Sequence, residues 1–100
     1  MIKHIVLWRL KDRVNGQGKA EIARELKKRL EALRGVVPGL LHLEVGLDFL
    51  KSESSSDLAL YTEFSSREAL DAYQKHPAHQ EFVDFSHDLR SERRVVDYEV

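Results

Sequence analysis

The chain has 100 residues, of which 42% are hydrophobic and 33% charged, with no cysteine and a formal net charge of -1 at pH 7. This length predicts one domain, residues 1–100, and the near-neutral charge argues against a nucleic-acid or anionic-membrane partner. The lack of cysteine excludes disulfides and cysteine-bound zinc, and no apolar run approaches the roughly 20 residues of a membrane span.

The first expected element is a strand over residues 2–10, which are mostly β-branched or aromatic. Alternation along a strand places His4 on the same face as Val6 and Trp8. The strand is apolar on both faces, so we expect both faces to be covered. Because the strand pattern starts at the N-terminus and no signal peptide is recognisable, we expect a cytoplasmic protein.

An amphipathic helix is expected over residues 19–34, after a loop formed by Asn-Gly-Gln-Gly at 15–18. Apolar residues at spacings of four, four and three form one stripe along it. The stripe consists of Ile22, Leu26, Leu30 and Leu33. Gly35 suits the end of the helix, and Pro38-Gly39 turns the chain.

Two further strands are expected after this turn. Residues 40–49 alternate between apolar and polar side chains, which predicts a half-buried strand. Its apolar side would carry Leu41, Leu43, Val45, Leu47 and Phe49. A polar, serine-rich loop leads to a strand over 57–64, with Leu58, Leu60 and Phe64 on one face.

Ser65 and Glu68 form a capping box that opens a second helix. Pro77 ends or kinks that helix and suits the first position of a following helix over 77–89, before a last strand over 92–99. The order β-α-β-β-α-β predicts an α+β, ferredoxin-like subunit whose four-stranded antiparallel sheet has helices on one face. Because nothing covers the other face, we expect two sheets to face each other in a homodimeric α/β barrel.

A polar constellation stands out in the segment Tyr-Gln-Lys-His-Pro-Ala-His at 73–79, together with His4. If His76 caps the helix that Pro77 opens, His79 lies in its first turn, where the helix dipole lowers the pKa of an imidazole. A neutral imidazole at pH 7 suits a general base, and the Tyr73 hydroxyl suits a donor to a substrate carbonyl. We expect Val6, Trp8 and His76 to contact the same ligand.

The same residues also fit purely structural roles, as a helix cap, a core tyrosine and a buried histidine bonded to a carbonyl. The sequence alone leaves both interpretations open. The spacing of His76 and His79 differs from the zinc-binding pattern with histidines four apart. His42 and His87 fit no motif and are predicted at the surface. Nucleotide-binding and serine-hydrolase motifs are absent.

Four segments together resemble the stress-responsive dimeric α/β-barrel (Dabb) family, over essentially the whole chain. They are Ile-Lys-His-Ile-Val-Leu at 2–7, Val-Pro-Gly-Leu at 37–40, the Tyr73 to His79 segment, and Val-Asp-Tyr at 96–98. The resemblance implies a small homodimer of ferredoxin-like subunits joined into a barrel. Some members of the family hold a magnesium ion on backbone carbonyls after the first helix. Those carbonyls would correspond here to Arg34, Val37 and Leu40.

The family includes the plant polyketide cyclase that forms olivetolic acid, whose site residues match His4, Tyr73 and His79. By this resemblance His79 is the base that removes a carbon-bound proton from a poly-β-keto thioester. Tyr73 holds the carbonyl and His4 helps to position the substrate, with no organic cofactor.

Three functions therefore remain open. The first is a stress-associated protein that binds a small apolar or aromatic carbonyl compound in a barrel pocket lined by His4, Tyr73 and His79. The second is a cofactor-independent polyketide cyclase or lyase with His79 as general base. The third is an oxygenase of the wider dimeric ferredoxin-like group that acts on haem or quinol-like aromatics. The residues do not decide between binding and catalysis.

Overall fold

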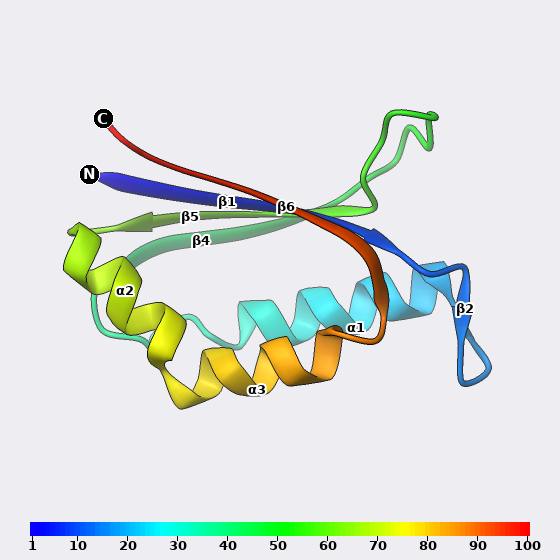
Figure 1. Cartoon of the computed structure of the whole chain (residues 1–100), viewed down its shortest axis with the longest axis horizontal. Coiled ribbons are helices and arrows are strands. Elements are labelled where there is room, and N and C mark those ends of the chain that lie inside the picture. Colours follow the sequence, from blue (N-terminus) through cyan, green and yellow to red (C-terminus); the bar gives the residue numbers. More distant parts are fainter.

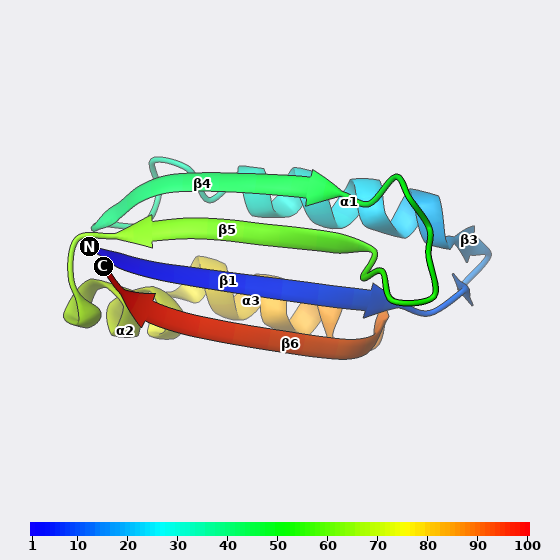
Figure 2. The same cartoon turned by 90° about the horizontal axis from the view of Figure 1, so that it is seen from above.

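The computed structural model describes all residues, 1–100. A four-stranded sheet is covered on one face by three helices (Figures 1 and 2). The strands are β1 (Ile2–Leu10), β4 (Leu40–Leu47), β5 (Leu58–Phe64) and β6 (Arg90–Glu99), in the spatial order β4-β5-β1-β6. All neighbouring pairs are antiparallel. The helices are α1 (Lys19–Glu31), α2 (Arg67–Lys75) and α3 (Pro77–Ser86). The predicted ferredoxin-like α+β fold is confirmed.

The core lies between the sheet and the helices. Alternation along β1 turns one row of side chains toward the helices, and that row is buried. The row is Ile2, His4, Val6, Trp8 and Leu10. The predicted stripe of the first helix, Ile22 to Leu33, is buried against the sheet, although α1 itself ends at Glu31. Burying each such aliphatic side chain contributes about 1.5–3 kcal/mol to folding.

The junction between α2 and α3 places the histidine segment. His76 has an extended backbone, φ -67° and ψ 137°, as expected for a residue before proline. It ends α2 and caps α3, because its Nδ1 accepts a hydrogen bond from the Ala78 N–H at 3.1 Å. The predicted cap of α2 was wrong by one residue, since the Ser66 hydroxyl accepts from the Ala69 N–H at 3.0 Å.

Strand β4 corrects the predicted inner face of residues 40–49. The pairing register shifts between Leu40 and His42, so Leu41 is the extra residue of a bulge and is 57% exposed. Leu43 and Val45 are buried as predicted. The strand ends at Leu47, which is exposed, and Phe49 beyond it is 91% exposed.

The loop predicted at 15–18 is instead the turn of a short hairpin. Strands β2 (Arg13–Val14) and β3 (Gln17–Gly18) pair around Asn15 and Gly16. Both turn residues have positive φ, 49° and 81°, which is the conformation that Asn-Gly provides in a type I′ turn.

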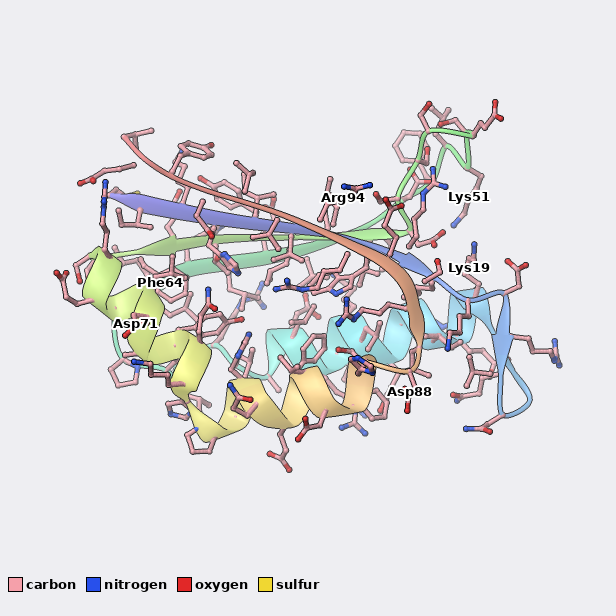
Figure 3. The ribbon with its side chains drawn as sticks, in the orientation of Figure 1. Lys19, Lys51, Phe64, Asp71, Asp88 and Arg94 are labelled. Carbon is pink, nitrogen blue, oxygen red and sulfur yellow. The ribbon has the colours of Figure 1, made fainter.

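The second face of the sheet carries no helix (Figure 1). Leu7 of β1 and Val96 and Tyr98 of β6 are exposed there by 39%, 52% and 42%. Figure 3 shows Arg94 on this open face, whereas Phe64 lies between the sheet and the helices. No helix is long and apolar enough to cross a membrane.

Candidate functional site

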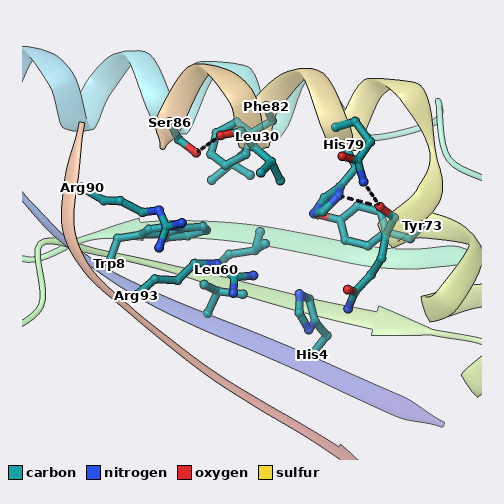
Figure 4. Close-up of a pocket in the computed structure, with 14 residues that line it drawn as sticks. His4, Trp8, Leu30, Leu60, Tyr73, His79, Phe82, Ser86, Arg90 and Arg93 are labelled. Atoms are coloured by element: carbon teal, nitrogen blue, oxygen red, sulfur yellow. Dashed lines mark hydrogen bonds between the residues drawn. The ribbon is translucent and has the colours of Figure 1, made fainter. Parts of the chain in front are cut away.

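A cavity of about 220 Å³ lies between the sheet and the helices of a single subunit (Figure 4). It is lined by His4, Val6, Trp8, Leu30, Leu60, Tyr73, Gln74, His79, Gln80, Phe82, Val83, Ser86, Arg90 and Arg93. Alternation along β1 turns its histidine toward the helices, so the expected barrel pocket is placed inside the subunit and not between two facing sheets. Five of the six residues predicted to contact a ligand line this cavity.

His4 forms part of the cavity floor and is 1% exposed. It lies opposite Asp97 in the pairing of β1 with β6. Because the Asp97 carboxylate accepts, Nδ1 of His4 carries the proton and donates to Oδ1 of Asp97. This pairing fixes the orientation of the ring and leaves Nε2, which has no partner in the chain, for the cavity.

His79 sits in the first turn of α3 as predicted and is 9% exposed. The Gln74 carbonyl can only accept, so the Nδ1–H of His79 donates to it, at 3.2 Å. Nε2 therefore carries a lone pair and has no partner in the chain. The Gln80 side-chain amide donates to the same carbonyl at 2.6 Å (dashed lines in Figure 4).

Burial is the main cause that lowers the pKa of His79 below its ordinary value of 6.5. The hydrogen bond to Gln74 acts in the opposite direction, and the charges of His4 and Arg93 add to the lowering. The lowered pKa of His79 agrees with the prediction, but its main cause is burial and not the predicted helix dipole. His79 is a neutral imidazole at pH 7, ready to accept a proton at Nε2.

Tyr73 is 1% exposed and its ring lies against His79, with 4.4 Å between the ring centroids. Its hydroxyl makes no hydrogen bond to the chain. All side-chain nitrogen and oxygen atoms that are fully buried have a hydrogen-bond partner. Because the Tyr73 hydroxyl has none, it is not fully buried and faces the open space of the cavity. Burial raises the pKa of Tyr73 to about 12, so the hydroxyl stays protonated and can donate.

His76 lies outside the lining, contrary to its predicted contact with a ligand. Its Nδ1 is occupied by the cap of α3. Trp8 and Val6 do line the cavity, and the Trp8 ring packs edge-on against Phe82, with 5.9 Å between centroids. The bulky indole closes one end of the space, which shortens the cavity.

The predicted magnesium ligands, the backbone carbonyls of Arg34, Val37 and Leu40, lie between the end of α1 and the start of β4. The Val37 carbonyl already accepts the Leu40 N–H at 3.4 Å. The Arg34 guanidinium folds onto the Leu43 carbonyl at 2.8 Å, in the same surface hollow as Leu40. A magnesium ion on these three carbonyls therefore stays a prediction. No group of three histidine or acidic side chains is placed to hold a metal elsewhere.

Asp97, Arg93, Arg90 and Gln74 are among the residues of the site that were not predicted from the sequence. Strand β6 provides Asp97, Arg93 and Arg90. Gln74 lines the cavity, and its backbone carbonyl accepts the hydrogen bond from His79. Period-two alternation places Arg93 and Asp97 on one face of the last strand. That pattern could have identified them once β6 was paired with the strand of His4.

The pKa of His79 predicts a pH dependence of stability. The folded state holds fewer protons than the unfolded state below pH 6.5, so the free energy of unfolding falls as the pH falls through the lowered pKa of His79. Above about pH 6.5 the ring is neutral in both the folded and the unfolded state, so His79 causes no loss of stability there. Urea unfolding at pH about 5 and about 7.5 should show the advantage of wild type over His79→Asn shrinking at the lower pH. A pH-independent difference, the same as for the exposed His87→Asn control, contradicts the lowered pKa.

Comparison with known proteins identifies one matching family and several solved structures with the same fold. The model of the stress responsive A/B barrel domain family matches residues 2–100. A dimeric protein of unknown function with a ferredoxin-like fold from Bacteroides fragilis is 32% identical, with a TM-score of 0.87 over 99% of this chain and 95% of that one. A dimeric ferredoxin-like protein of unknown function from Thermobifida fusca is 23% identical, with a TM-score of 0.85 over 99% and 90%.

A hydroxynitrile lyase from Passiflora edulis shares the fold, with a TM-score of 0.83 over 99% of this chain and 92% of that one. Its identity of 16% supports a common fold and nothing finer. No curated protein matches the chain.

Proposed function

We propose that this chain, which belongs to the stress-responsive A/B barrel domain family, binds a small carbonyl compound and moves a proton at the carbon next to the carbonyl. The observation that supports this proposal is that three polar atoms face the same cavity and have no hydrogen-bond partner in the chain. They are Nε2 of His4, the hydroxyl of Tyr73 and Nε2 of His79. Buried polar groups are almost always hydrogen-bonded, so such atoms suit a bound ligand.

The proton step follows from the protonation states of the two residues. Nε2 of His79 takes the proton, and the electrons of the broken C–H bond form the C=C bond of an enolate. The negative charge moves to the carbonyl oxygen, to which the Tyr73 hydroxyl donates. His4, held by Asp97, fixes the position of the ligand. Return of the proton, closure on a second carbonyl or loss of a leaving group then gives exchange, cyclase or lyase chemistry.

The size of the cavity limits the ligand. Pockets for drug-sized molecules measure about 300–1,000 Å³, whereas this cavity measures about 220 Å³. An engineered cavity of about 150 Å³ holds benzene. The space therefore suits one substituted aromatic ring or a short aliphatic carbonyl compound. A haem or a long polyketide chain is too large for this space, which argues against an oxygenase that acts on haem.

We further propose that a second copy of the chain covers the open face of the sheet. The exposed apolar side chains of Leu7, Val96 and Tyr98 lie on that face. The similar proteins from Bacteroides fragilis and Thermobifida fusca are both described as dimeric. Sedimentation equilibrium at micromolar concentration should give twice the mass of 11.6 kDa. A single-chain mass contradicts the dimer and leaves the cavity unaffected, because the cavity lies within one subunit.

The proton step is tested with acetophenone, which fits a one-ring cavity and carries exchangeable protons beside its carbonyl. In D₂O at neutral pH, proton NMR should show its methyl signal decaying faster with the native protein than with an equal concentration of free imidazole. Positioning the base beside the carbon is the reason for the faster exchange. A rate equal to that of free imidazole contradicts the proposed function.

A further inference from the structure

We infer that Arg90 and Arg93 together bind a carboxylate, so that the ligand is a small oxo acid with its carbonyl and carboxylate at opposite ends of an apolar spacer. This inference rests on the proposed function, because it adds a second anchoring point to the same cavity. We name these two residues the arginine pair.

The arginine pair lies at the end of the cavity away from the histidines. Both side chains line the cavity and come from the start of β6. Figure 4 shows them extending beside Trp8, whereas His4 and His79 lie at the other end. Arg90 is half-buried and Arg93 is exposed at the mouth. Neither guanidinium makes a hydrogen bond or an ion pair with the chain.

The neighbouring acidic residues are already engaged elsewhere. Glu92 lies 2.7 Å from Arg94 and 3.6 Å from Arg9. Glu99 lies 3.0 Å from Arg67, at the far end of β6. Asp97 lies on the same strand face as Arg93 and accepts a hydrogen bond from His4. The arginine pair therefore carries two positive charges and has no carboxylate in direct contact, although the charge of Asp97 partly offsets that of Arg93.

Two adjacent guanidinium groups at a partly buried site repel each other. The pKa of Arg93 is lowered, first by burial and then by the charge of Arg90. An anion between the two groups would remove the repulsion and satisfy several N–H donors at once. A carboxylate matches this geometry because guanidinium groups bind its two oxygens in pairs of parallel hydrogen bonds.

The order of groups along the cavity defines the ligand. The arginine pair stands at one end, Leu60 and Phe82 form an apolar middle, and Tyr73 and His79 stand at the other end. A cavity of about 220 Å³ has room for about one ring between the two ends. A substituted benzoate with a ketone on the far side of its ring has this arrangement.

The test compares 4-acetylbenzoate with 4-acetylbenzamide, which has the same shape and no charge. Affinities are measured by titration calorimetry for wild type, Arg90→Gln, Arg93→Gln and the control Arg94→Gln. Arg94 lies on the same strand but on the open face. Because hydrogen bonds to charged groups are worth more than neutral ones, we expect wild type to bind the acid about tenfold or more tighter than the amide. Loss of either member of the arginine pair should remove most of that preference, and Arg94→Gln should keep it.

Equal affinity for the acid and the amide in wild type, or no binding of the acid at millimolar concentration, overturns the arginine pair as a carboxylate site. So does a preference that survives both Arg90→Gln and Arg93→Gln. The proposed function is judged separately, by proton exchange of the neutral ketone acetophenone. That reaction needs no carboxylate, so the two failures are distinguishable.

Discussion

His79→Asn is expected to slow exchange of the methyl protons of acetophenone by about 10²–10⁴-fold, the usual contribution of a positioned general base. Asparagine has no basic nitrogen, so the acceptor of the proton is lost. Its side-chain amide can still donate to the Gln74 carbonyl in place of Nδ1–H, which preserves the local hydrogen bond. The rate is followed by proton NMR in D₂O under the conditions used for wild type.

His87→Asn is the matched control, because His87 is exposed and lies at the opposite end of α3. It should exchange acetophenone at the wild-type rate. The rate of wild type should also rise with pH through the lowered pKa of His79 and level off by about pH 7. Retention of the wild-type rate in a folded His79→Asn protein contradicts the role of His79 as the base.

Trp8→Ala is expected to lower the free energy of unfolding by about 3–5 kcal/mol, the range for removal of a buried aromatic ring. The indole is 3% exposed, packs edge-on against Phe82 and closes the arginine end of the cavity. Its removal joins a new void to the existing one, and the β1 backbone is held on both sides by β5 and β6, so the site can collapse little. Urea unfolding at one fixed protein concentration measures the change, since dissociation of a dimer would otherwise contribute.

Two further variants calibrate this measurement. Trp8→Phe keeps an aromatic ring and should lose clearly less stability than Trp8→Ala. Val36→Ala, at a position 50% exposed in the turn after α1, should change the free energy of unfolding by no more than about 0.5 kcal/mol. A loss of less than about 1 kcal/mol for Trp8→Ala would contradict its place in the core.

The order of the elements and much of the cavity wall could be predicted because local patterns determine them. Period-two alternation placed His4, Val6 and Trp8 on one face, and that face is buried. The proline at position 77 fixed the helix junction, which brings His79 into the first turn of α3 beside Tyr73. Each of these features depends on residues close together in the chain.

The wrong predictions concern pairing between strands, which a local pattern does not contain. Alternation predicted Leu41 inside, but the bulge before His42 turned it outward. Asp97 and Arg93 joined the site only because β6 pairs with β1 in one register, with Asp97 opposite His4. A shift of one residue would have turned both side chains to the open face.

His76 belongs to the histidine segment that was predicted from the sequence, but it does not line the cavity. The sequence predicted that it contacts the same ligand as Val6 and Trp8. The extended backbone before proline instead directs its ring to the Ala78 N–H, where it caps α3. The cap positions His79, so His76 acts on the geometry of the cavity without lining it.

The protonation state of His79 tests the proposed function most directly, because the proposed proton step requires a neutral imidazole with a free Nε2. Long-range ¹H–¹⁵N NMR of histidine-labelled protein at neutral pH distinguishes the two tautomers and the imidazolium form. We expect a neutral ring with its proton on Nδ1, and an Nε2 resonance that moves when 4-acetylbenzoate is added. An imidazolium at neutral pH, or a proton on Nε2, would contradict the assignment of His79 as a base facing the cavity.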